Sequence, residues 1–271
     1  MHDIFFFTDI HGCRPLFDAI MNYCKTQDPE CSIIFGGDAC DRGEDGYRIM
    51  KELLADPQVG YLKGNHEDMF CAAARELKQE YHPYTPPTRE EAHHFLSCTR
   101  GFDYRYEAIQ TSLYNGGMST LTDWIMDGMP MDIVEQLEKL PYTFSYGKLD
   151  FCHSGGGYNS FTRVAEKEYS SQPVDEYDAE YLLWSRTSFD NDWKLGRTVV
   201  FGHTPTPYLH EYADCKSCDK AVPIKLSTGR LDMDTGAAFT GRAFVLNILT
   251  MQAQGFELKN DEVEEIEVIQ F

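Results

Sequence analysis

The sequence contains no apolar segment long enough to cross a membrane. It also lacks a basic N-terminal segment followed by a long apolar stretch, which is the pattern of a secretory signal peptide. Its first apolar run covers residues 4–7 only and ends before Asp9. Internal repeats and low-complexity tracts are absent as well, which argues against a repeat architecture. We therefore expect a folded, cytoplasmic protein with no membrane partner.

Positive charge is scarce in this chain. Lys and Arg number 24 against 44 Asp and Glu, so the formal net charge is −20 at pH 7. Nucleic-acid binding requires a cationic surface that displaces phosphate counterions. We therefore do not expect nucleic acid as the main partner, and some of the carboxylates are candidates for metal binding instead.

The cysteines do not have the spacing of a disulfide framework. There are nine, an odd number, mostly single and beside apolar segments, which is typical of reduced residues in an intracellular protein. Cys40 is interpreted as one such small buried residue. The close pair Cys215-x-x-Cys218 has no second pair, so a four-cysteine zinc site is unsupported. A surface loop is favoured there over a redox pair or a small zinc site with His210.

Apolar residues make up 42% of the 271 residues, which is enough for a substantial core. Short apolar runs predict buried strands, and segments with apolar residues at helical spacing follow the first three of them. This alternation is typical of βαβ units, so we predict an α/β fold with a largely parallel sheet. The strands are expected at residues 4–7, 32–35, 59–62, 142–146, 149–152, 198–201 and 243–249, with an edge strand at 263–268. The helices are expected after Pro15 and at residues 46–54, 67–80 and 121–139, the last one interrupted near Gly128 and Pro130.

The middle of the chain has a different composition. Residues 81–105 contain three prolines and many charged and aromatic residues. We predict an insertion or cap of helices and loops at about residues 81–140, within a single catalytic domain that spans residues 1–271. The segment from Tyr81 to Tyr106 has two interpretations, because it could shape substrate access or only pack over the core.

Polar side chains follow five of the expected strands, in each case beside a glycine. Ligand sites in α/β folds form where the carboxyl ends of strands converge, so we expect these side chains to meet. Carboxylate, imidazole and one amide oxygen suit Mn, Fe, Zn or Co better than Ca or Mg, and a shared carboxylate can bridge two such ions. One such residue alone is more often structural, so the prediction depends on all five strand ends together. The residues are Asp9 and His11, Asp38 and Asp41, Asn65 and His66, His153, and His203.

Two of these segments carry a family resemblance. Asp38-x-x-Asp41-Arg42-Gly43 and Gly64-Asn65-His66-Glu67 resemble motifs of the calcineurin-like metallophosphoesterase superfamily, in particular its Ser/Thr phosphoprotein phosphatase branch with bacterial and phage-type members. The match spans Asp9 to His203. Shorter similarities lie at residues 115–117, 182–186 and 234–236. The fold that this resemblance implies has two central mixed β-sheets sandwiched by helices in four layers, with a helical and loop insertion.

Two positions depart from the family pattern. Thr8 stands where the first motif usually begins with glycine, and Ser154 follows His153 where glycine or alanine is usual. Neither departure removes a candidate ligand, so they bear on the subfamily rather than on activity.

The resemblance implies two divalent metal ions, with Mn favoured and Fe, Zn, Co or Ni as alternatives. A hydroxide that bridges the ions would attack phosphorus in line with the leaving group. The implied ligands are Asp9, His11 and Asp38 for one ion, and Asp38, Asn65, His153 and His203 for the other.

The resemblance also implies the catalytic side chains. His66 would protonate the leaving alkoxide as general acid, with Asp41 orienting its imidazole. Arg42 and Arg186 would bind phosphate oxygens, since guanidinium matches them bidentately, and Asn65 would contact the substrate. Arg42 lies in a dense motif, whereas Arg186 depends on a short local similarity.

The function implied is a dimetal phosphomonoesterase, foremost a Ser/Thr protein phosphatase, with phosphotyrosine as a further substrate. Its partner would be a phosphorylated protein or a small phosphoester, and the sequence predicts no oligomeric state. The alternative is a symmetrical dinucleoside tetraphosphatase or another nucleotide phosphohydrolase, but that relative usually lacks Asp41 and carries Asp at the position of Glu67. Nucleases of this kind usually have a second His where Pro205 stands. A binding module without activity would have lost ligands that are present here.

Overall fold

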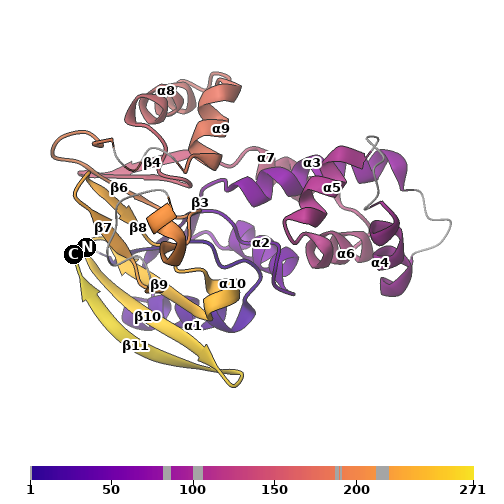
Figure 1. The fold of residues 1–271 in the computed structure, drawn as a ribbon, viewed down its shortest axis with the longest axis horizontal. Helices are drawn as coiled ribbons and strands as arrows, with labels where there is room; N and C mark the ends of the chain where they lie inside the picture. Colours follow the sequence, from indigo (N-terminus) through magenta and orange to yellow (C-terminus); the bar gives the residue numbers. More distant parts are fainter. Residues whose placement is uncertain (1, 82–86, 100–105, 187–188, 190, 212–219) are drawn as a thin grey trace.

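Two β-sheets packed face to face, with helices on the outer faces, form the computed structural model in Figure 1. The structure describes residues 2–81, 87–99, 106–186, 189, 191–211 and 220–271. Cys215, Cys218 and part of the segment from Tyr81 to Tyr106 lie outside these residues. In the part of the chain described, no helix has both the length and the apolar character that a membrane span needs. The predicted arrangement of two mixed sheets between helices is confirmed.

The first sheet has six strands in the order β11-β10-β9-β1-β2-β3. Strands β1 (Ile4–Phe7), β2 (Ser32–Phe35) and β3 (Val59–Tyr61) pair in parallel, as the alternating pattern predicted. Helices α1 (Arg14–Gln27) and α2 (Gly46–Ala55) make the two crossovers. Parallel strands need such crossovers, because the end of one strand and the start of the next lie at opposite ends of the sheet along the strand direction.

The other half of this sheet is antiparallel. Strand β9 (Arg242–Asn247) pairs with β1, and β10 (Gln252–Lys259) and β11 (Glu262–Gln270) follow it. Strand β11 lies at the edge, as its mixture of β-branched and acidic residues predicted. Charged side chains suit an edge strand, since they discourage pairing with another chain.

The second sheet has five strands in the order β4-β5-β6-β8-β7. Strands β5 (Leu149–Cys152), β6 (Thr198–Phe201) and β8 (Arg230–Asp232) are parallel. Strands β4 (Thr143–Tyr146) and β7 (Ile224–Leu226) close its two edges in antiparallel pairing. Helices α8 (Tyr158–Tyr169) and α9 (Glu176–Trp184) lie beside this sheet, at the top of Figure 1, and neither was predicted.

A group of helices separates the two halves of the chain in sequence and lies to one side in Figure 1. It comprises α3 (Asn65–Glu80), α4 (Arg89–Cys98), α5 (Glu107–Tyr114), α6 (Met118–Met126) and α7 (Met131–Glu138). The gap between α6 and α7 coincides with the predicted interruption. The described part of residues 81–142 contains no strand, in agreement with the expected helical and loop character.

The alternation of side chains on β1 shows how the layers are built. Phe5 and Phe7 belong to the apolar cluster under the helices of the first sheet, whereas Phe6 belongs to the cluster between the two sheets. There Phe6 meets Phe151 of β5, with ring centroids 5.3 Å apart. Successive side chains of a strand point to opposite faces. A strand buried on both faces therefore has the unbroken apolar sequence that predicted it.

Candidate active site

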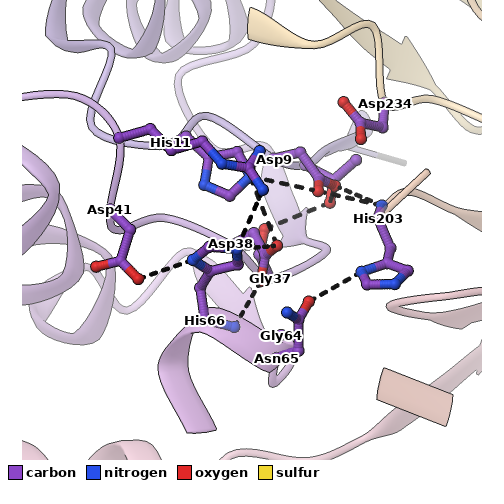
Figure 2. A network of polar contacts seen from close by, with 12 residues as sticks. Asp9, His11, Gly37, Asp38, Asp41, Gly64, Asn65, His66, His203 and Asp234 are labelled. Atoms are coloured by element: carbon purple, nitrogen blue, oxygen red, sulfur yellow. Dashed lines mark hydrogen bonds and ion pairs between the residues drawn. The ribbon is translucent and has the colours of Figure 1, made fainter. Parts of the chain in front are cut away.

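The loops after β1, β2, β3, β5 and β6 meet at one place, where the two sheets adjoin (Figure 2). Several of these loop residues have a left-handed backbone, which for a residue other than glycine costs roughly 1–3 kcal/mol. Such strain persists only where the surrounding structure imposes it, and it is common at functional sites. The residues are Asp9 (φ 53°), His11 (46°), Asp38 (60°), Asp41 (68°), Arg42 (66°) and His203 (70°).

Asp38 lies between two groups of imidazoles. Its Oδ2 is 3.6 Å from Nε2 of His11 and 3.8 Å from Nε2 of His66. Its Oδ1 is 3.3 Å from Nε2 of His153. Candidate ligand atoms within 4.8 Å of one another form two clusters that share Asp38: His11, Asp38 and His66, and Asp38, His153 and His203. A shared carboxylate is the feature that a pair of bridged ions requires.

Hydrogen bonds behind the imidazoles fix which ring nitrogen faces Asp38. His11 Nδ1 donates to the carbonyl of Cys40 at 2.9 Å, and His153 Nδ1 donates to the carbonyl of Gly36 at 2.9 Å. Because Nδ1 carries the hydrogen, the neutral ring has its lone pair on Nε2. Each lone pair is therefore directed toward Asp38, as a metal ligand requires.

Asn65 brings the second cluster together. His153 Nε2 and His203 Nδ1 both lie 2.9 Å from the side-chain oxygen of Asn65. Lone pairs held this close repel one another unless a proton or a metal ion lies among them. Imidazole nitrogen with carboxylate and amide oxygen is a suitable donor set for a borderline transition metal. The residues of both clusters thus fit divalent ions.

The acid groups of the site are buried and act on one another. Burial raises the pKa of Asp9 to about 6, His153 opposes this shift, and the charge of Asp38 adds to it. Burial would also raise the pKa of Asp38, but the imidazoles of His153 and His66 outweigh it and keep this pKa well below its usual value. Burial lowers the pKa of His153, yet the two carboxylates raise it overall to about 9. The buried carboxylates of Asp9 and Asp38 therefore stabilise a positive charge placed between them and His153.

His66 and Asp41 form a buried pair next to the first cluster. Nδ1 of His66 donates to Oδ2 of Asp41 at 2.7 Å (Figure 2). Burial lowers the pKa of His66, but Asp38 and Asp41 outweigh it and raise this pKa. In the described residues Asp41 Oδ1 has no hydrogen-bond partner, so nothing else competes for this carboxylate.

Arg42 connects the pair to the candidate ligands. Its Nη1 donates to Nε2 of His11 at 2.7 Å, and its Nη2 donates to Nε2 of His66 at 3.2 Å. Its backbone N–H donates to the carbonyl of Gly116 at 3.0 Å, within one of the short segments similar to the family. An ion bound by His11 Nε2 needs this guanidinium to turn away, and the rest of Arg42 is exposed and has room to do so.

Arg186 reaches the site from the end of α9. Its Nη1 donates to the carbonyl of His203 at 2.9 Å and to the hydroxyl of Thr204 at 3.0 Å. The structure thus places it beside one candidate ligand, His203.

Glu67 has a structural role that sequence reasoning missed. Its carboxylate accepts four hydrogen bonds: from the N–H groups of Asp38 (2.8 Å), Ala39 (2.8 Å) and Gly64 (2.9 Å), and from the hydroxyl of Tyr61 (2.8 Å). It thereby joins the loop after β2 to the start of α3. The Gly-Asn-His-Glu motif was the available signal, but it gave no hint of these partners.

Both departures from the family pattern make hydrogen bonds. Thr8 Oγ1 donates to Oδ2 of Asp9 at 2.6 Å, which fixes the orientation of that carboxylate. Ser154 donates from its backbone to the carbonyl of Leu182 at 2.9 Å and from its hydroxyl to that of Tyr181 at 3.2 Å. Ser154 therefore ties the end of α9 to the loop that carries His153.

Two further buried carboxylates lie at the end of β8 and just after it. Asp234 lies beside Asp9 and His203 in Figure 2, and Asp232 accepts a hydrogen bond from its backbone at 3.0 Å. Burial raises the pKa of Asp234 well above its usual value, and the charge of Asp9 adds to this shift. The sequence showed only a short similarity at residues 234–236 and did not assign either residue to the site.

Residues 2–233 match the family model of the calcineurin-like phosphoesterases. The chain belongs to this family. It is accordingly a metal-dependent phosphoester hydrolase, whose family uses a centre of two metal ions. No curated protein matches the chain significantly in sequence.

Solved structures share the fold of this calcineurin-like phosphoesterase at low sequence identity. A protein assigned as a diadenosine tetraphosphatase is 13% identical, with a TM-score of 0.51 over 98% of this chain and 93% of its own. A cold-active protein tyrosine phosphatase is 15% identical, with a TM-score of 0.51 over 98% and 79%. One from a psychrophilic Shewanella is 15% identical, with a TM-score of 0.50 over 98% and 81%. At this identity the likeness shows the fold alone.

The structure brings the predicted residues of this phosphoesterase together from distant parts of the chain. Arg186 is the most peripheral of them, because it contacts the site through the backbone of His203. The others converge around Asp38: Asp9, His11, Asp41, Arg42, Asn65, His66, His153 and His203.

Proposed function

We propose that this phosphoesterase is a dimetal protein phosphatase for phosphoserine and phosphothreonine, with phosphotyrosine as a further substrate and Mn as the favoured metal. The observation that carries the proposal is the buried hydrogen bond of 2.7 Å between His66 and Asp41. The alkoxide of serine is a poor leaving group and needs a proton as the P–O bond breaks. The phosphate released from a phosphoanhydride is a better leaving group and needs such help less. A charged imidazole that a carboxylate keeps in place therefore accelerates the hydrolysis of esters of alcohols most.

The ligands would be Asp9, His11 and Asp38 for one ion, and Asp38, Asn65, His153 and His203 for the other. Divalent ions held there would polarise the phosphoryl group and acidify the attacking water. Thr8 and the backbone N–H of His203 orient Asp9, and the carbonyls of Cys40 and Gly36 orient His11 and His153.

Substrate binding would rearrange Arg42. A phosphate oxygen competes with the two imidazoles for its guanidinium, and the charged, bidentate contact to phosphate is the stronger one. Once Arg42 turns to phosphate, Nε2 of His66 is free to carry a proton toward the leaving oxygen. Asp41 keeps the Nδ1 hydrogen and stabilises the imidazolium. Arg186 and the side-chain amide of Asn65 would also bind phosphate oxygens.

The alternative is a symmetrical dinucleoside tetraphosphatase or another nucleotide phosphohydrolase. A diadenosine tetraphosphatase assignment belongs to one structural neighbour, although at 13% identity. We favour the protein phosphatase because of Asp41 and Glu67, and we propose that residues 1–271 act as one catalytic domain with α4 to α7 as its cap.

A substrate panel tests this proposal. The purified, Mn-loaded protein is assayed with phosphoserine and phosphothreonine peptides, a small alkyl phosphomonoester and diadenosine tetraphosphate. We expect kcat/KM to be highest on the peptides. A higher kcat/KM on diadenosine tetraphosphate than on every phosphopeptide would contradict the proposal and support the alternative.

A further inference from the structure

One face of α9 carries aromatic side chains that the core does not use. Leu182 packs in the apolar cluster with residues of the second sheet and α8, and Leu183 is buried, while Tyr177 is 71% and Trp184 40% exposed. With Tyr181, which lies between them at helical spacing, Tyr177 and Trp184 line a pocket of about 490 Å³. Pockets for small molecules and side chains measure about 300–1,000 Å³. The remaining lining residues are Glu180, Ser185 and Arg186.

Two of the residues that line this α9 pocket contact His203 of the candidate metal site. The Trp184 ring stands edge-on to the His203 ring, with centroids 6.0 Å apart, and Nδ1 of His203 lies 2.9 Å from Asn65. Arg186 lines the pocket and donates to the carbonyl of His203. The pocket thus adjoins a candidate metal ligand, beside which the phosphate of a substrate would bind. An aryl ring esterified to that phosphate would reach it directly, whereas a nucleobase is held away from its nearest phosphate by a ribose.

The wall of the pocket is held in place. Ser154 donates to the carbonyls of Tyr181 and Leu182, which fixes the last turn of α9. A side chain at Gly157 would place its Cβ 3.1 Å from Cε1 of Tyr181, so glycine there lets the ring lie over the loop. The rings of Tyr177 and Tyr181 are parallel within 2°, with centroids 6.4 Å apart. Ordered aromatic rings of this kind stack well on another ring.

The charge around the pocket favours one class of substrate. Asp175, Glu176 and Glu180 are exposed on the same helix or at its start, and the whole chain carries a net charge of −20. A dinucleoside polyphosphate carries several negative charges and would be repelled by these residues. A peptide with Lys or Arg near its phosphorylated residue would be attracted to them.

We propose that the α9 pocket binds the aromatic ring of phosphotyrosine in a basic peptide and is the subsite that extends the proposed Ser/Thr phosphatase to this further substrate. This inference rests on the proposed phosphatase function and deepens it. In the reaction, the oxygen of water bonds to phosphorus and the P–O bond to the tyrosine oxygen breaks. One water proton remains on the released phosphate, and one proton is delivered to the tyrosine oxygen. Tyr177 acts as a substrate contact and takes no part in the chemistry.

The test compares one basic peptide in two forms, with phosphotyrosine or phosphoserine, on the Mn-loaded protein. Wild type should hydrolyse both forms and should have the lower KM on the phosphotyrosine form. Tyr177→Ala should raise KM for that form by about two- to tenfold, the size of one aromatic contact. The kcat for that form, and both kcat and KM for the phosphoserine form, should stay within about twofold of wild type. Tyr177→Phe should restore the KM, because it keeps the ring. Tyr169→Ala is the matched control, since Tyr169 is 96% exposed on the neighbouring helix α8 and outside the pocket.

A second variant tests the charge. Glu180→Lys should raise KM for the phosphotyrosine peptide flanked by Arg and lower it for the same peptide flanked by Glu. An unchanged preference between these two peptides would overturn the assignment of a basic substrate.

Several outcomes would overturn the inference and leave the phosphatase proposal intact. These are an unchanged phosphotyrosine KM in Tyr177→Ala, or an equal loss on both peptide forms. A third is a wild-type dimer that dissociates in Tyr177→Ala, which would make this face an interface between copies of the chain. Failure of the proposed function is distinguishable, since no phosphopeptide would then be hydrolysed while diadenosine tetraphosphate is.

Discussion

Asp41 accepts a hydrogen bond of 2.7 Å from Nδ1 of His66, and both side chains are buried. The opposite nitrogen of the ring faces Arg42 at the exposed side of the site. A buried carboxylate behind an imidazole fixes the tautomer and stabilises the charged ring. This relationship separates His66 from the neighbouring imidazoles, whose second nitrogens donate to backbone carbonyls.

His66→Asn should therefore retain both metal ions and lose kcat on a phosphoserine peptide by about 10²–10⁴-fold. The loss should be much smaller on nitrophenyl phosphate, because nitrophenolate leaves without a proton. Asp41→Asn should show the same pattern more mildly. The measurements are steady-state kinetics on both substrates and elemental analysis of each variant. Loss of one ion with equal damage on both substrates would make His66 a ligand instead.

Removal of the metal should abolish activity. Exhaustive chelation should stop hydrolysis of an aryl phosphate and added Mn should restore it, with two ions per chain by elemental analysis. Asp38→Asn should lower occupancy of both positions, because Asp38 is shared by the two clusters. Asp18→Asn is the control, since Asp18 is an exposed carboxylate on α1. Full activity in a verified metal-free sample would disprove the dimetal assignment.

The two site arginines should affect phosphate binding. Arg42→Ala and Arg186→Ala should each lower kcat/KM by about 10- to 100-fold, the effect of a lost charged hydrogen bond. Metal content should not fall, since neither side chain is a ligand. Arg48→Ala, on the exposed side of α2, should leave kcat/KM unchanged. Wild-type kinetics in Arg186→Ala would remove that residue from the site.

Glu67 should matter for stability as well as for activity. Glu67→Ala leaves four buried donors without their acceptor and should lower the free energy of unfolding by roughly 3–5 kcal/mol. Glu67→Gln should not rescue this loss, because its amide nitrogen would face N–H groups that also donate. Denaturant titration of the metal-free protein measures the effect, with Glu262→Ala on the edge strand β11 expected within about 0.5 kcal/mol of wild type. A Glu67→Ala value close to that control would show that the four bonds contribute little.

The strands that carry the site were predictable because they are buried on both faces. Their apolar runs, which end at a glycine and a polar residue, are not a pattern that surface segments usually have. Strand β8 was missed because Arg230 and Asp232 look like surface residues in sequence. In the fold Arg230 is buried, donates to the carbonyls of Gly155 and Gly156, and lies 5.2 Å from the ring centroid of Trp193. Partners this distant along the chain cannot be inferred from a local pattern.

Helix α9 was missed for a related reason. Its buried face includes Asp178, whose carboxylate accepts from Arg163 of α8 at 2.6 Å, so the helix lacks a clean apolar stripe. Within the site, the sequence predicted the candidate ligands but not the hydrogen bonds that position the surrounding loops and side chains. The four bonds of Glu67 and the contact of Arg42 with His11 depend on how loops close in three dimensions.

The backbone N–H of His203 donates to both carboxylate oxygens of Asp9 at 3.1 Å, across 194 positions of the chain. One residue follows a strand of the first sheet and the other a strand of the second. Contacts of such long separation are slow to form, because closing the long loop between them costs entropy before the contact stabilises the chain. A nascent chain that has made only β1, β2 and β3 therefore holds Asp9 and Asp38 without their imidazole partners from the second sheet. Whatever this site binds can be held tightly only once the two halves have docked, so ligand affinity reports on completed folding.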